Sequence, residues 1–68
     1  MNNDHIKVVL HEQQIMLFKE NLKEWQRHAD DICSNRPQEA VSLKVLCQDG
    51  LETLDSLYET LQEIYLLL

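Results

Sequence analysis

The chain has 68 residues, of which 12 are acidic and 6 are basic, giving a net charge of −6, and 44% are hydrophobic. A domain this short buries only about 60% of its unfolded surface, which leaves little room for an enzyme's pocket. The single Gly and single Pro exclude a sheet of several strands, because such a sheet needs turn residues repeatedly. We therefore expect one all-α, non-enzymatic domain over residues 1–68, without a cofactor or a metal ion.

The negative charge argues against nucleic-acid binding, which depends on clustered Lys and Arg. No segment approaches the roughly 20 apolar residues of a membrane span. Residues 1–14 have neither the charged region nor the cleavage site of a secretory signal. These features predict a cytoplasmic protein that inserts into no membrane and binds no nucleic acid.

The first predicted helix covers residues 4–33, a segment without Gly or Pro. Its apolar residues recur at alternating steps of three and four, the coiled-coil spacing that places side chains in one stripe along a helix. His11 fills the one step that lacks an apolar residue. The predicted stripe consists of Val8, His11, Ile15, Phe18, Leu22, Trp25, Ala29 and Ile32.

A short break follows, because Arg36 precedes a proline and is biased away from helical geometry, whereas Pro37 suits the first turn of a new helix. The second helix is predicted over residues 37–67. An alternative ends one helix at Gly50 and begins a third there, although the stripe passes Gly50 without a change of phase. The second stripe consists of Ala40, Leu43, Cys47, Gly50, Leu54, Leu57, Leu61, Ile64 and Leu68.

Two helices joined by a short break are expected to pack as an antiparallel helical hairpin. A turn centred on Arg36 places Leu22 opposite Gly50. The same register places Trp25 beside the small residues Cys47 and Gly50, where an indole ring could be accommodated in a packed interior.

The cysteines and histidines do not form a recognisable chemical site. Cys33 lies near the turn and Cys47 about 12 Å farther along the axis, too far for a disulfide in this fold, so both are expected to be buried or half-buried thiols. None of the three histidines shares a face with a cysteine at metal-ligand spacing. His11 is either an exposed bystander or a pH-sensitive contact.

The net negative charge concentrates in the second helix, because residues 45–68 contain five acids and no base. This arrangement predicts either a solvated face or a surface for a basic partner. The acidic residues are Asp49, Glu52, Asp55, Glu59 and Glu63.

Apolar residues outside the two stripes outnumber those that a hairpin can bury, and most fall at the end away from the turn. We expect them to bind a partner, unless a third helix covers them. The predicted partner-binding residues are Ile6, Val9, Leu10, Met16, Leu17, Leu51, Tyr58, Tyr65, Leu66 and Leu67.

The chain length, the break Arg36-Pro37-Gln38-Glu39 and the Leu-rich second helix ending in Ile64-Tyr65 resemble the small co-chaperones of type III secretion needle subunits, the YscE-type proteins. This resemblance implies a cytoplasmic helical hairpin that forms a heteromer with a larger, tetratricopeptide-like chaperone and helps it to hold the secreted needle subunit. The alternatives are a homodimeric four-helix-bundle regulator and an acidic inhibitor of a basic partner.

Overall fold

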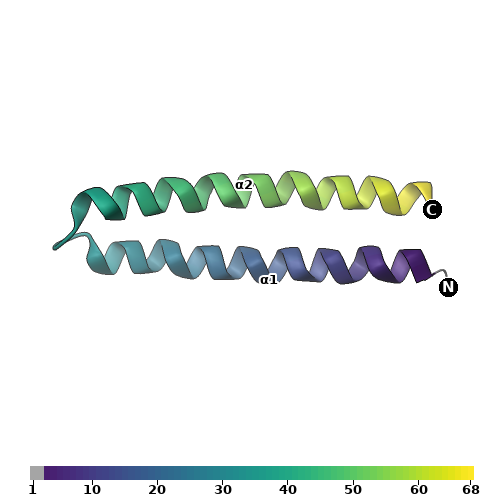
Figure 1. Ribbon diagram of the computed structural model, residues 1–68, viewed down its shortest axis with the longest axis horizontal. Coiled ribbons are helices and arrows are strands. Elements are labelled where there is room, and N and C mark those ends of the chain that lie inside the picture. Colours follow the sequence, from purple (N-terminus) through teal and green to yellow (C-terminus); the bar gives the residue numbers. More distant parts are fainter. Residues whose placement is uncertain (1–2) are drawn as a thin grey trace.

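The computed structural model describes residues 3–68 as two long helices, α1 (Asn3–Ile32) and α2 (Pro37–Leu67). The helices lie side by side and antiparallel, with both chain ends at one end of the molecule and the turn at the other (Figure 1). The predicted all-α hairpin is confirmed. The first helix begins and ends one residue earlier than predicted, and the second has the predicted bounds.

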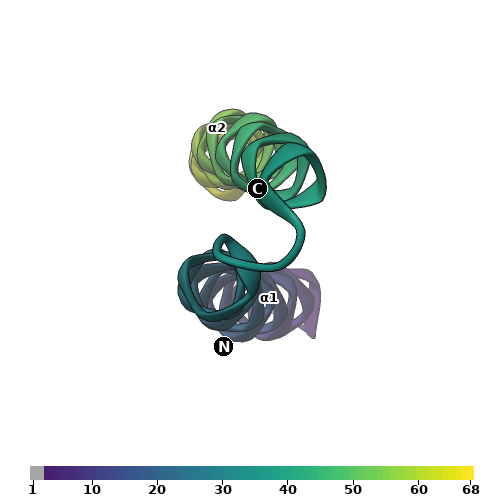
Figure 2. The same ribbon diagram turned by 90° about the vertical axis from the view of Figure 1, so that its left-hand side faces the viewer.

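Residues 3–68 form a single layer of two helices, and no other part of this described range packs on either side of it (Figure 2). The Cα positions extend 52 × 15 × 9 Å, and the radius of gyration is 15.8 Å. A compact domain of this length has a radius of gyration of about 11 Å. Each helix therefore covers one face of its neighbour and leaves its other faces open. In the described residues, neither helix carries an apolar stretch suited to crossing a membrane.

The turn forms as the break in the sequence predicts. The carbonyl oxygen of Ile32 accepts hydrogen bonds from the backbone N–H groups of Asn35 (3.2 Å) and Arg36 (2.8 Å), which closes α1. Arg36 has the non-helical dihedral angles φ −138° and ψ 66°, and Pro37 occupies the first turn of α2. The N–H of Ala40 donates to the carbonyl oxygen of Arg36 at 3.0 Å and so begins the hydrogen-bond ladder of α2.

Gly50 lies inside α2, which continues through it without interruption, so the alternative with three helices is wrong. Its place in the hairpin explains the absence of a side chain. A Cβ atom at Gly50 would lie 3.0 Å from Cδ1 of Leu22 on α1. The predicted opposition of these two residues is confirmed, and this contact fixes the register between the helices.

The core of the hairpin is small because only five hydrophobic residues among those described are buried. Three of them have small side chains and lie in the half nearer the turn, which lets the helix backbones approach each other closely there. The five are Val8, Ile15, Ala29, Ala40 and Cys47.

The face that α1 turns toward α2 differs in part from the predicted stripe. The row of every seventh residue from Val8 to Ala29 faces α2, as predicted. The prediction is wrong for the second row, because His11, Phe18 and Trp25 are all exposed. The indole of Trp25 is 54% exposed and does not fill the space beside Cys47.

The positions beside α2 that were predicted for this second row are instead occupied by Glu12, Lys19 and Gln26, which are half-buried. Each is one position later in the sequence, so α1 is rotated about its axis relative to the prediction. The contacts of the polar row account for the rotation, because Lys19 forms an ion pair with Asp55 and Gln26 a hydrogen bond with Gln48 of α2. The aromatic row then lies at the edge of the interface.

The same rotation appears in α2. Leu57 and Ile64 of the predicted stripe are 46% and 40% exposed. Leu51 and Tyr58, which were predicted to bind a partner, are instead half-buried in the helix interface. The two long edges of the interface therefore differ in chemistry, one polar and one apolar.

Candidate protein interaction surfaces

One edge of the interface, which we call the polar side, joins α1 to α2 by side-chain hydrogen bonds and ion pairs. Four residues of each helix form it: Glu12, Lys19, Gln26 and Asp30 of α1, with Lys44, Gln48, Asp55 and Tyr58 of α2. Because each polar group finds its partner across the interface, this edge of the hairpin is largely satisfied within the chain.

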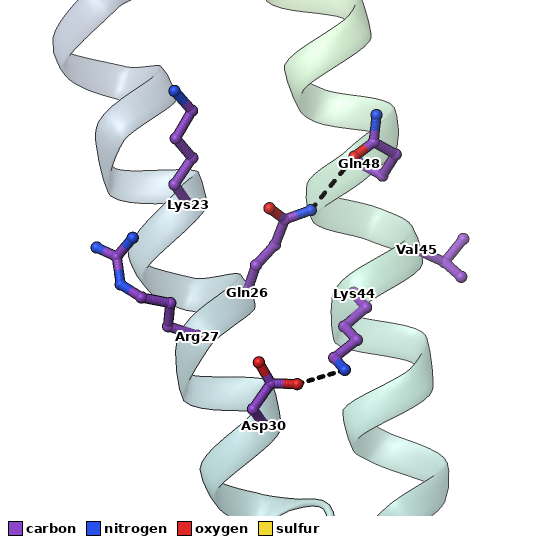
Figure 3. Close-up of a pocket in the computed structure, with 7 residues that line it drawn as sticks. All are labelled: Lys23, Gln26, Arg27, Asp30, Lys44, Val45 and Gln48. Carbon is purple, nitrogen blue, oxygen red and sulfur yellow. Dashed lines mark hydrogen bonds and ion pairs between the residues drawn. The ribbon is translucent and has the colours of Figure 1, made fainter.

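The part of the polar side nearest the turn is an open hollow (Figure 3). Gln26 reaches across it, and its Nε2 donates to Oε1 of Gln48 at 3.5 Å. Lys44 forms an ion pair with Asp30. Lys23, Arg27 and Val45 complete the lining of the hollow. These contacts join α1 to α2, and the hollow beside them stays open to solvent.

Two proton-bearing groups of the polar side are held by carboxylates of α1. The hydrogen bond from Lys44 to Asp30, reinforced by the negative charge of that carboxylate, raises the pKa of Lys44. The hydroxyl of Tyr58 donates to the carboxylate of Glu12, and this hydrogen bond raises the pKa of Tyr58. Both shifts favour the protonated form, which is the form that makes the contact.

The opposite edge, which we call the apolar strip, has no such partners. Its centre is a groove of about 310 Å³ between the helices, lined by His11, Gln14, Ile15, Phe18, Leu54, Leu57 and Leu61. Trp25 lies two turns beyond Phe18 on the same side of α1, and Leu46 and Ile64 extend the Leu57 side of α2. The apolar strip is the set His11, Phe18, Trp25, Leu46, Leu54, Leu57, Leu61 and Ile64.

The apolar strip exposes large side chains. Phe18 is 55% exposed and Leu46 is 68% exposed. The sequence placed Phe18, Trp25, Leu57 and Ile64 in the core, so this surface was missed. The signal that could have revealed it is the polar row four residues after the buried row of α1, which can pair with α2 only if the aromatic row turns outward.

A second exposed apolar surface lies on the half of the hairpin away from the turn and extends to the middle of α1. We call it the open-end surface, and most of the predicted partner-binding residues lie on it. Leu17 is 67% exposed, and Leu66 and Leu67 are 84% and 87% exposed. Its members are Ile6, Val9, Leu10, Met16, Leu17, Tyr65, Leu66 and Leu67, all more than 40% exposed.

The structure brings only some of these residues together. Val9, Tyr65 and Leu66 line one hollow that bridges the two helices. Met16 lines a neighbouring hollow with Tyr58. His5 lies against Tyr65 with ring centroids 4.5 Å apart. The two hollows share Gln62, so these apolar side chains lie near one another beside the polar side, with polar residues between them.

Leu10 and Leu17 lie on a different part of the open-end surface. Each is two residues from a buried residue of α1, Val8 or Ile15, and therefore points away from α2. Leu51 lies apart from all of them, half-buried toward the middle of the interface. A partner that contacts the whole open-end surface must therefore wrap around α1.

The described residues do not gather the groups of a metal centre, because no three His, Cys, Asp or Glu side chains in residues 3–68 are placed to share an ion. His11 Nδ1 lies 3.3 Å from Oε1 of Gln14, and His28 meets Trp25 edge to face with centroids 5.6 Å apart. Both cysteines are free thiols.

The two thiols differ in exposure. Cys47 is buried as predicted, whereas Cys33 is exposed, which corrects the prediction of a buried or half-buried thiol. Cys33 lies where α1 has ended, so α2 does not cover it, and its thiol donates to the carbonyl oxygen of Asp30 at 3.1 Å.

Comparison of the chain with family models, with curated proteins and with solved structures gave no match. The molecule is thus a thin helical hairpin. The polar groups of one edge pair with each other within the chain, and two apolar surfaces are exposed.

Proposed function

We propose that this protein is a non-catalytic interaction module whose open-end surface binds a larger protein partner. The observation that carries the proposal is the concentration of large, exposed apolar side chains on the open-end surface, which no third element among residues 3–68 covers. Apolar patches of this kind on a small protein mark interaction sites.

The shape of the surface favours a partner that wraps around the end of the hairpin. Leu10 and Leu17 point to one side of α1, whereas Val9 and Leu66 face a hollow beside α2. A concave helical protein can contact both groups at once. The resemblance in layout to YscE-type co-chaperones makes a tetratricopeptide-like chaperone of a secreted needle subunit the first partner to test, with this chain as the cytoplasmic co-chaperone.

The test compares the full chain with two variants that each add one negative charge at an exposed position. Leu17→Asp alters the open-end surface, and Ser34→Asp, in the turn at the opposite end of the hairpin, is the control outside that surface. A protein recovered from the native host with the wild-type chain is purified, and its affinity for each variant is measured by calorimetry. We expect Leu17→Asp to weaken binding by at least about 30-fold, as for a hot-spot residue.

Equal affinity of the wild-type chain, Leu17→Asp and Tyr65→Asp would show that the open-end surface is not the binding site. The salt dependence separates this proposal from binding of a basic partner to the acidic face of α2. Apolar docking changes little with added salt, whereas attraction between exposed charges is screened over about 10 Å at 0.1 M salt. Loss of binding on addition of salt would therefore favour an acidic inhibitor.

A further inference from the structure

The apolar strip is uncharged over its central part, and an acid borders it only at the end nearer the turn, where Glu39 lines a hollow with Leu46. On α1 the residues that face this side from His11 to Trp25 are His11, Gln14, Phe18, Asn21 and Trp25. On α2 they are Leu46, Gly50, Thr53, Leu54, Leu57, Leu61 and Ile64. A basic or acidic partner would find no complementary charge here, so the strip fits an occupant whose own contact surface is apolar.

The chain also exposes more surface than a folded monomer of its size normally does. Its accessible surface is 5309 Å² for a mass of 8.1 kDa. Folded monomers of that mass expose about 4,500 Å². The excess, about 800 Å², equals the area that each partner contributes to a protein interface of standard size.

The distribution of charge also favours the apolar strip as the contact surface between two copies. Each chain carries a net charge of −6, so two copies repel each other over most approaches. Two acids of α2 lie on the polar side: Asp55 pairs with Lys19, and Glu59 lines a hollow with Met16. Glu39 borders the strip only at its end nearer the turn, where it lines a hollow with Leu46. The rest of the strip is a long face through which two copies can meet without placing carboxylates together.

The strip is complementary to itself in shape. Phe18 and Trp25 form a row of aromatic side chains on α1, and Leu54, Leu57 and Leu61 line the α2 wall of the adjoining groove. A two-fold axis parallel to the helices places the aromatic row of each copy against the leucine wall of the other. Such a contact is isologous, so both copies bury the same side chains.

From these relationships we infer that a second copy of this chain covers the apolar strip, forming a symmetric four-helix bundle. Each copy then completes the core of the other, and the aromatic side chains that are half-exposed in one hairpin become interior. The open-end surface lies outside the strip and stays accessible, so this inference goes beyond the proposed function and leaves the partner site free.

Sedimentation equilibrium of the full chain at micromolar concentration tests the inference. We expect twice the chain mass of 8.1 kDa for the wild-type protein and for the control Gln13→Asp. Phe18→Asp adds the same charge inside the strip and is expected to weaken dimerisation by at least about 30-fold. A single mass of 8.1 kDa at every concentration, or an unchanged dimer in Phe18→Asp, would overturn it.

Fluorescence gives a second readout that needs no variant, because Trp25 is the only tryptophan. In the dimer its emission is expected at the short wavelengths of a buried indole, with weak quenching by iodide. Dilution should shift the emission to longer wavelength over the concentrations at which the mass halves. An emission that reports an exposed indole while the mass is doubled would place the contact on another surface and overturn the inference.

Partner binding is scored separately on the same samples. A wild-type chain that stays monomeric but binds its partner through Leu17 overturns the dimer alone. A dimer that meets the sedimentation and fluorescence expectations but whose partner affinity is unaffected by Leu17→Asp and Tyr65→Asp overturns the proposed function alone.

Discussion

The side chain of Leu22 lies directly over Gly50, with its Cδ1 atom 3.0 Å from the position of a Cβ atom there. Two opposing effects meet at this contact. Glycine inside a helix costs about 1 kcal/mol relative to alanine. An added methyl group would force Leu22 to move, which offsets part of that gain.

We therefore expect Gly50→Ala to stabilise the hairpin by less than the full helix gain of about 1 kcal/mol. In a Leu22→Ala background, where the space is open, the same substitution should give the full gain. Urea unfolding followed by circular dichroism on the four proteins of this double-mutant cycle gives the difference. Equal gains in both backgrounds would show that Leu22 does not limit the space at Gly50.

The ion pair between Lys19 and Asp55 joins α1 to α2 across the polar side. We expect Lys19→Glu to destabilise the hairpin by about 1 kcal/mol, since a partly exposed pair is worth little and is here replaced by repulsion. Adding Asp55→Lys should restore most of the stability. Lys7→Glu, an equal change of charge at an exposed site on α1, is the control, and urea unfolding is the measurement.

Failure of the charge swap to restore stability would indicate that Lys19 acts through its aliphatic stem and not through Asp55. The comparison is informative because Lys19 is the more buried of the two side chains, 29% exposed against 59% for Asp55. Long lysine stems cover apolar surface while their charged ends stay in water.

The stability of the hairpin is expected to fall at alkaline pH. The pKa of Tyr58 is raised from its ordinary value of 10.0 and that of Lys44 from 10.5. The folded chain therefore holds both protons more tightly than the unfolded chain does. Their contribution is fully present below pH 10 and is lost as the pH rises through the raised values. Urea unfolding between neutral pH and about pH 11 measures this loss.

Glu12 is the principal cause of the shift at Tyr58, so Glu12→Gln should lower the pKa of Tyr58. The measurement uses a Tyr65→Phe background, in which Tyr58 is the only tyrosine, and follows phenolate absorbance during titration. An unchanged Tyr58 pKa in Glu12→Gln would contradict the hydrogen bond between these residues.

The orientation of the two copies in the proposed dimer can be tested at Cys33. This thiol is exposed and lies beside the turn, whereas Cys47 is buried, so a spin label attaches selectively to Cys33. A two-fold axis parallel to the helices brings both turns to the same end of the bundle. We expect a label separation far below the 52 Å length of the hairpin. A separation near that length would indicate copies with turns at opposite ends.

The sequence by itself determined the two helices, their junction and their register. The break at Arg36 and Pro37 is a local steric property, and the position of the turn then fixes which residues lie at the same level. The contact between Leu22 and Gly50 follows from the position of the turn alone, because the turn places these two residues at the same height along the hairpin. The surplus of apolar residues at the open end could also be recognised, because it depends only on their number and spacing.

Only the tertiary structure decided which long face of α1 turns inward. The aromatic row of Phe18 and the polar row of Lys19 flank the same buried row and are separated by only about 100° around the helix. Helical spacing fits both rows. The choice depends on α2, whose polar groups Gln48 and Asp55 pair with the polar row of α1. The apolar strip is therefore a property of the pair of helices and not of either helix alone.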